Sequence, residues 1–181
     1  ILFPNSSSFR IAFDMVISGT AEGEGGVQLT PWWSQLVDGR VNCRTTDGEI
    51  ACFGGRLPFY SFTGNHGLHY VKGTSIHLEV TYLSNGLSSS DPATVEYKVV
   101  YGGTFSSGPL PFDEGNPSED PPHGLWGMLN EAQAGGYVQE FLQAGNPAAA
   151  LVTEYSNIVF EQLKPVSVES TSWGKLKAAN R

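Results

Sequence analysis

Hydrophobic and polar positions alternate with a period of two along most of the chain. In the first such segment, Phe9, Ile11, Phe13, Met15 and Ile17 alternate with Arg10, Ala12, Asp14 and Val16. The pattern recurs at residues 75–82, 95–101, 137–143 and 157–163. Because neighbouring side chains of a strand point to opposite faces, this period predicts half-buried β-strands. Short helical turns fit only residues 124–134 and 147–153.

Clusters of Gly, Pro, Asn and Asp separate these segments, and the pairs Asn85-Gly86 and Gly102-Gly103 favour tight hairpins. Many strands joined by hairpins predict an all-β fold, an antiparallel β-sandwich or jelly roll. A chain of 181 residues suits one domain. We expect the sandwich to span residues 1–164, and residues 165–181 to form a linker and C-terminal tail.

Three segments resemble a known superfamily. They are FRIAFD at residues 9–14, GEIACFGG at residues 48–55 and YSNIVFE at residues 155–161. This layout resembles the concanavalin A-like sandwiches, which include laminin-G-like modules, lectins and several polysaccharide lyases and hydrolases. The resemblance implies a concanavalin A-like jelly roll over residues 8–164.

The spacing of Cys43 and Cys52 predicts a disulfide. Asp47-Gly48 between them is a preferred pair for a two-residue hairpin turn. Counting outward from that turn places the two cysteines directly opposite each other, about 4.5 Å apart at the Cα atoms. This separation is near the short end of the disulfide range. The alternative is a buried, reduced pair.

Composition limits which classes of partner the protein can bind and indicates the cellular compartment in which it works. The chain has 10 Lys and Arg against 18 Asp and Glu, a formal net charge of -8, so we expect no nucleic-acid partner. It has no apolar run long enough to span a membrane. A start at Ile1 without a leader-like segment, together with the cysteines, indicates a mature, secreted protein; a fragment of a longer chain is the alternative. Asn5-Ser6-Ser7 matches the N-glycosylation sequon.

An acidic stretch between residues 113 and 120 is a candidate calcium site. Carboxylate and amide oxygens on a loop kinked by Pro and Gly suit this ion, which takes six to eight oxygen ligands. The candidate ligands are Asp113, Glu114, Asn116, Glu119 and Asp120. The stretch does not match the EF-hand spacing, and a solvated loop is the alternative.

Two adjacent tryptophans suggest a carbohydrate ligand. Neighbouring residues of a strand face opposite ways, so at least one indole is expected at the surface, where a flat ring can stack on a sugar. One indole over the core and the other closing the end of the sandwich is the alternative. We expect the ligand to contact Trp32, Trp33, Arg40, Arg44 and Tyr60. Glu22 and Glu24 fall in a glycine-rich stretch that indicates a flexible loop.

One motif raises an enzymatic alternative. Residues 134–139, AGGYVQ, are similar to the A-G-x-Y-x-Q core of jelly-roll alginate lyases, and Ser75-Ile76-His77 partly resembles their Q-[IV]-H strand. Those enzymes use Tyr and His as base and acid in a β-elimination, and Arg and Gln neutralise the uronate carboxylate. The resemblance implies His77 and Tyr137 as the proton-transfer pair. Ser75 replaces the motif Gln, residues 131–133 replace Y-F-K, and an acidic chain would repel a polyuronate.

The C-terminal tail differs from the acidic body. Residues 173–181 carry three positive charges and Trp173, which could dock on the acidic surface of a second subunit and form a homo-oligomer. Plain disorder is the alternative.

Taken together, these features favour a secreted, noncatalytic module that binds a polysaccharide or glycan. A structural subunit connected through Ile1-Leu2-Phe3 and the Trp173 tail is the first alternative, and a polysaccharide lyase is the second.

Overall fold

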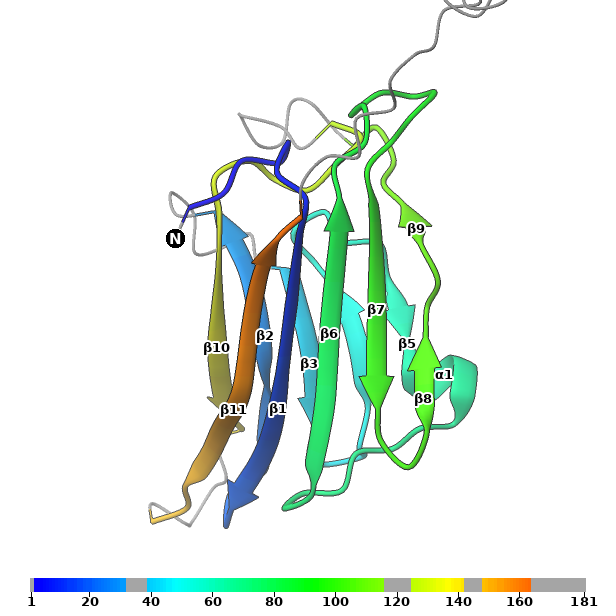
Figure 1. Ribbon diagram of the computed structural model, residues 1–181. Helices are drawn as coiled ribbons and strands as arrows, with labels where there is room; N and C mark the ends of the chain where they lie inside the picture. Colours follow the sequence, from blue (N-terminus) through cyan, green and yellow to red (C-terminus); the bar gives the residue numbers. More distant parts are fainter. Residues whose placement is uncertain (1, 32–38, 116–124, 142–147, 164–181) are drawn as a thin grey trace, which may run out of the picture.

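The computed structural model describes residues 2–31, 39–115, 125–141 and 148–163. Two antiparallel sheets lie face to face as a β-sandwich, which confirms the predicted all-β class (Figure 1). The helix α1 (Phe62–His66) is short. Within the described ranges, no helix has the length and hydrophobicity needed to cross a bilayer.

Each sheet combines a run of consecutive strands with one or two strands that are distant in sequence. The six-stranded sheet runs in the order β11 (Leu151–Gln162), β1 (Phe9–Gly19), β6 (Ser75–Leu83), β7 (Thr94–Val100) and β8 (Thr104–Ser106), and β9 (Leu110–Pro111) also pairs with β7. The five-stranded sheet runs in the order β10 (Ala132–Glu140), β2 (Gly23–Pro31), β3 (Gly39–Arg44), β4 (Ile50–Phe53) and β5 (Tyr60–Ser61).

The core lies between the two sheets and follows the period of two. The alternation expected in β1 and β6 is confirmed. The buried side chains of these two strands include Phe9, Phe13, Met15, Ile17, Ile76, Leu78, Val80 and Tyr82. Each fully buried side chain of this size contributes about 1.5–3 kcal/mol, so the inward face of each strand fixes which residues point out.

Two local expectations are wrong. The stretch expected to be a flexible loop at Glu24 is part of β2, where it pairs with β3 and β10. The segments expected to be helical contribute residues to β10 and β11, and the helix lies at α1 instead. Capping explains α1: the Ser61 side chain accepts a hydrogen bond from Gly64 N, and Gly67 ends the helix at a φ of 64°.

The predicted disulfide is also wrong, because the β3–β4 register differs. Arg44 N donates to Glu49 O, so residues 45–48 form the loop and Cys43 pairs with Ile50. Cys43 and Cys52 are then diagonal neighbours on the inner face. Both are free and buried. Diagonal positions lie about 7–8 Å apart, which exceeds the span of a disulfide.

The N-terminal segment belongs to the core of its own chain. Phe3 is 5% exposed, and its ring centroid lies 4.5 Å from that of Phe9. Its backbone exchanges two hydrogen bonds with Ala132. Phe3 is therefore not available as the intersubunit connector considered from the sequence, and the Trp173 tail lies outside the described residues.

Candidate functional site

The outer face of the five-stranded sheet gathers polar side chains, and we call it the polar face. Val27 and Leu29 of β2 and Val41 and Cys43 of β3 point into the core, so the alternate residues point outward. The polar side chains of this face are Glu24, Gln28, Thr30, Arg40, Asn42, Arg44, Gln133, Tyr137 and Gln139. They come from three adjacent strands.

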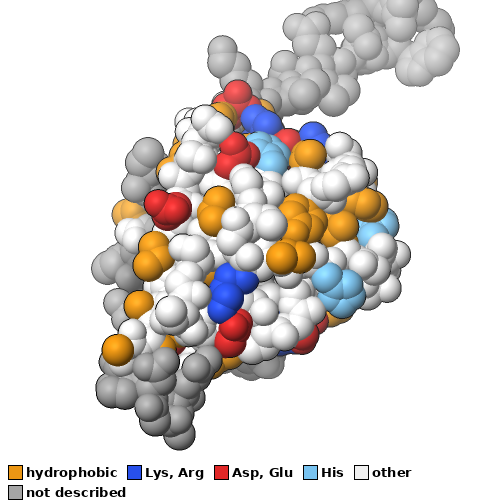
Figure 2. Space-filling view, turned by 90° about the horizontal axis from the view of Figure 1, so that it is seen from below, with side chains coloured by type: hydrophobic (Ala, Val, Ile, Leu, Met, Phe, Trp, Pro, Cys, Tyr) orange, Lys and Arg blue, Asp and Glu red, His pale blue; other side chains and the backbone are white. Residues whose placement is uncertain are grey.

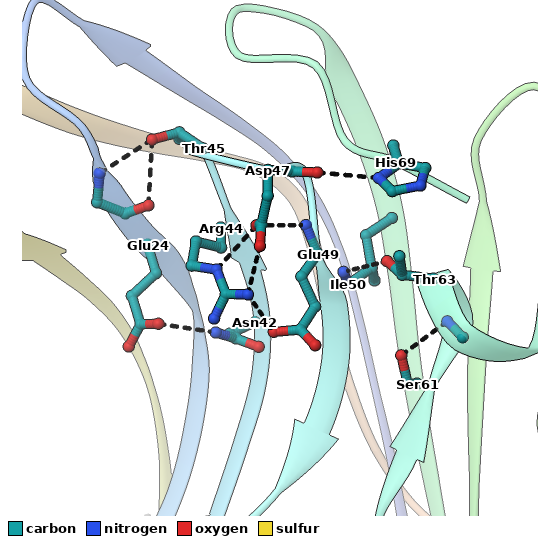
Figure 3. A network of polar contacts seen from close by, with 12 residues as sticks. Glu24, Asn42, Arg44, Thr45, Asp47, Glu49, Ile50, Ser61, Thr63 and His69 are labelled. Carbon is teal, nitrogen blue, oxygen red and sulfur yellow. Dashed lines mark hydrogen bonds and ion pairs between the residues drawn. The ribbon is translucent and has the colours of Figure 1, made fainter. Parts of the chain in front are cut away.

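A buried carboxylate organises the centre of the polar face. Glu24 is 8% exposed, and its carboxylate accepts hydrogen bonds from Arg40 Nη1 at 2.5 Å and from Asn42 Nδ2 at 3.0 Å. Figure 3 shows Asn42 pointing to Glu24 from the adjacent strand. The Arg40 guanidinium also lies over the ring of Tyr137, 5.2 Å from its centroid, and donates to Gln139. Because each charge is paired, the cluster is tolerated despite its burial.

Three buried polar atoms of this face have no hydrogen-bond partner in the described part of the chain. They are Oγ1 of Thr30, Oδ1 of Asn42 and the hydroxyl of Tyr137; a further such atom, Oγ1 of Thr153, belongs to the other sheet. Asn42 is only 1% exposed. Each unsatisfied buried group costs about 1–3 kcal/mol, so the polar face is less fully hydrogen-bonded than the rest of the described structure.

Burial also sets the protonation of Tyr137. It raises the pKa of this phenol, and the charge of nearby Glu24 raises it further. The hydroxyl therefore stays protonated at neutral pH and can act as a hydrogen-bond donor.

A polar hollow of about 150 Å³ opens between β2 and β10. Gln28, Thr30 and Gln133 line it, and Gly135 borders it with no atom within 4 Å of the position a Cβ would take. A larger cavity of about 300 Å³ lies between the sheets, but its lining is mostly apolar and includes Phe13, Val27, Tyr155, Ile158 and Phe160. We take the hollow as the candidate site because polar side chains of the polar face line it.

Tyr155 fixes the strand that carries Tyr137. Its hydroxyl reaches from β11 to Gly26 O at 2.5 Å and accepts the N–H of Tyr137 at 3.1 Å. A Cβ at Gly136 would lie 2.7 Å from the ring of Tyr155, and a Cβ at Gly26 would lie 1.9 Å from the carbonyl oxygen of Val41. Glycine at these two positions therefore allows the close approach that positions the site.

Arg44 lies at one end of the polar face and is engaged locally. Its Nη2 lies 2.5 Å from Asp47 Oδ2 and 2.9 Å from Glu49 Oε2 (Figure 3). The hydrogen bond from Arg44 lowers the pKa of Asp47 to about 2. The view from below in Figure 2 shows acidic and basic side chains interspersed with uncharged ones. A ligand contact at Arg44 would have to compete with these ion pairs.

The structure does not bring His77 and Tyr137 together. His77 lies on the outer face of the six-stranded sheet, with Nδ1 2.6 Å from Asp14 and Nε2 3.2 Å from Glu79. Tyr137 lies on the polar face of the opposite sheet. The two side chains cannot transfer protons to and from one bound sugar, because the strand that resembles Q-[IV]-H is β6 of the other sheet.

The other expected ligand contacts are dispersed. Tyr60 pairs with Cys52 on the inward side, and its hydroxyl lies 2.8 Å from His66 Nε2, so it does not face the polar side chains. Trp32 and Trp33 lie outside the described residues, in the connection from β2 to β3. Of the five predicted contacts, the structure places Arg40 and Arg44 on the polar face.

The candidate calcium ligands are only partly described. Asp113 Oδ1 accepts from Arg56 Nη1 at 2.6 Å, a hydrogen bond that lowers the pKa of this carboxyl, and Glu114 is exposed. Asn116, Glu119 and Asp120 lie outside the described residues. Among the residues that the structure describes, no three His, Cys, Asp or Glu side chains form a group that could hold a metal. Calcium binding stays a prediction.

Glu24, Gln28 and Gln133 were not among the expected contacts. The usable signal was the alternation of Gln28 and Thr30 with Val27 and Leu29, which marks a strand with a polar outer side. The glycines before Val27 are typical of a loop, so the sequence did not indicate where that strand begins.

Comparisons with known proteins found no relative. A scan against protein-family models, a search of curated proteins and a search of solved structures each found no match.

Proposed function

We propose that the protein is a noncatalytic polysaccharide-binding module and that the polar face is its binding surface. The observation that carries this proposal is the polar hollow lined by Gln28, Thr30 and Gln133, on a face where Thr30, Asn42 and Tyr137 each bury an oxygen without a partner among the described residues. Sugar hydroxyls both donate and accept hydrogen bonds. They would pair with the amides of Gln28 and Gln133 that line the hollow and, where binding opens the surface above them, with the buried phenol of Tyr137 and the Asn42 oxygen.

The electrostatics of the face favour a sugar over a strongly charged ligand. Glu24 neutralises Arg40 at 2.5 Å, and the hollow is lined by the uncharged side chains of Gln28, Thr30 and Gln133. A phosphate-rich ligand needs a basic surface. Neutral amides and hydroxyls instead suit the closely spaced hydroxyls of a glycan.

A glycan array probed with the full chain, followed by calorimetric titration with the glycan that binds best, tests the proposal. Tyr137→Phe removes one hydroxyl and should weaken binding about 5- to 30-fold, the equivalent of a hydrogen bond worth about 1–2 kcal/mol. Lys98→Ala, on the outer face of the six-stranded sheet, is the control and should bind like the parent. An array without a single bound glycan, or equal affinity for Tyr137→Phe and the parent, would overturn the proposal.

A lyase is the second candidate, because the A-G-x-Y-x-Q strand places Tyr137 and Gln139 beside Arg40. In this scheme Arg40 and Gln139 face the uronate carboxylate. Glu24, the carboxylate beside Arg40, takes the C5 proton, the C4–O bond breaks as the C4–C5 double bond forms, and Tyr137 protonates the departing oxygen. The raised pKa of Tyr137 suits it to be the acid rather than the base.

Absorbance near 235 nm separates the two candidates. Alginate, polygalacturonate and polyglucuronate serve as probes, since elimination creates an absorbing double bond. Rising absorbance that is lost in Tyr137→Phe establishes the lyase. Binding on the array without an absorbance change establishes the noncatalytic module.

A further inference from the structure

We infer that the bound polysaccharide crosses the strands of the polar face, from the hollow at Gly135 to a stacking position at Phe59. The inference rests on the proposed function and adds the direction and minimum length of the ligand. It also assigns a contact residue on a part of the sheet that the polar side chains do not reach.

The register of the five-stranded sheet aligns residues of successive strands along this direction. Gly135 lies opposite Gln28, Gln28 lies opposite Arg40, and Arg40 lies opposite Phe53. Directly opposed residues share one face of a sheet. These four residues therefore form a row that is perpendicular to the strands, with the hollow at one end and an aromatic ring at the other.

Phe59 extends the row past β4. Cys52 pairs with Tyr60, and both pack against the core, so Phe53 of β4 points outward, and we infer the same side for Phe59, which directly precedes β5. Phe59 is 69% exposed, the highest value among the exposed large hydrophobic side chains of the described residues. A flat ring in water at the end of a polar row suits stacking on the apolar face of a sugar ring.

The length of the row sets the size of the ligand. Adjacent strands lie about 4.8 Å apart, so the four spacings from β10 to β5 span about 19 Å. One sugar unit cannot contact both the hollow at Gly135 and the ring of Phe59. The structure therefore assigns a ligand of several linked units, with Arg40 facing its middle.

A chain-length series tests the inference on the full chain. Calorimetry would use cello-, xylo-, manno- and polyuronate-derived oligosaccharides of one to six units. We expect the affinity of the parent to rise with length until the row is spanned. Phe59→Ala should lower the affinity for the longest oligosaccharides about 3- to 10-fold, as expected for one aromatic contact. It should leave the affinity for single sugar units unchanged.

Two further variants test whether the loss of affinity depends on residues within the row. Gly135→Val fills the hollow, where a Cβ meets no atom within 4 Å, and should weaken binding at every length without unfolding the protein. Val71→Ala removes another exposed apolar side chain, 58% exposed and outside the row, and should change nothing. If oligosaccharides bind but Phe59→Ala matches the parent at every length, the inference fails and the proposed function stands. If none of them binds at any length, both fail.

Discussion

At the scale of single residues, two tyrosines on opposite sheets differ in how their hydroxyl groups are bonded. The hydroxyl of Tyr155 holds Gly26 and the backbone of Tyr137, while the hydroxyl of Tyr137 is buried without a partner among the described residues. The first hydroxyl stabilises the fold. The second is a cost of folding.

The two tyrosines should respond oppositely to the same substitution. Tyr155→Phe should lower the free energy of unfolding by about 1–3 kcal/mol, because it leaves backbone groups of β2 and β10 unpaired. Tyr137→Phe should leave it unchanged or raise it, since the lost hydroxyl made no hydrogen bond. Urea unfolding of both variants checks this, and an equal loss of stability in both would contradict our account of the site.

Glu79 should dominate the acid sensitivity of the fold. Burial raises the pKa of its carboxyl, but hydrogen bonds from Arg10 and Lys98 outweigh that effect and lower the pKa to about 2 from an ordinary 4.5. A lowered folded-state pKa gives stability that is present above the unfolded value and is lost as pH falls toward 2. The shift corresponds to a contribution on the order of 3 kcal/mol.

Urea unfolding between pH 7 and pH 2 measures this contribution. Glu79→Gln should be less stable than the parent at pH 7, and the difference should shrink as pH falls from about 5 to 2. The exposed carboxylate Glu154 of β11 supplies the control, and Glu154→Gln should follow the parent. A difference for Glu79→Gln that does not depend on pH would show that this carboxylate is not the acid-sensitive group.

At the scale of elements, the alternation of hydrophobic and polar residues predicted the strands, whereas the residue types of the turns did not predict how the strands pair. The strands around Phe9 and Ile76 were predictable because each has one buried face. The β3–β4 register was not, because Asp47-Gly48 fits either a two-residue turn or the end of the loop at residues 45–48. Gly48 has a φ of 75°, which suits both. The error kept every side chain on its correct face and displaced only the pairing.

That register makes a direct prediction for the two cysteines. Both thiols should be reduced and unreactive toward DTNB in the folded protein, since burial raises the pKa of each. Both should react in guanidinium chloride without added reductant. If neither reacts in the denatured, unreduced protein, a disulfide is present and the β3–β4 register described above is wrong.

The candidate site was predictable only in part, because sequence does not say which sheet a strand joins. Residue type predicts Arg40 as a ligand contact, the lyase-like motif predicts Tyr137 as a catalytic residue, and both lie on the polar face. His77 was assigned to the same site because its strand matched a pattern, but β6 lies in the other sheet. Glu24 was missed because its glycine neighbours suggested a loop, whereas Gly26 is required where β2 approaches β3.

At the scale of the whole molecule, the two outer faces differ in how their polar groups are used. On the six-stranded sheet, Glu79 contacts Arg10, His77 and Lys98, and Asp14 contacts His77 and Asn157. On the polar face, buried oxygens remain without partners among the described residues. The free thiols also remove the disulfide as an argument for secretion.

The most direct test of the account is a two-dimensional amide NMR titration of the full chain with the best-binding oligosaccharide from the array. We predict that the shifted resonances concentrate on β10, β2 and β3, at Tyr137, Asn42 and Gln28, and reach Phe59 only with the longer ligands. Shifts concentrated instead on β1, β6 and β7, around His77 and Glu79, would contradict the assignment of the polar face as the binding surface.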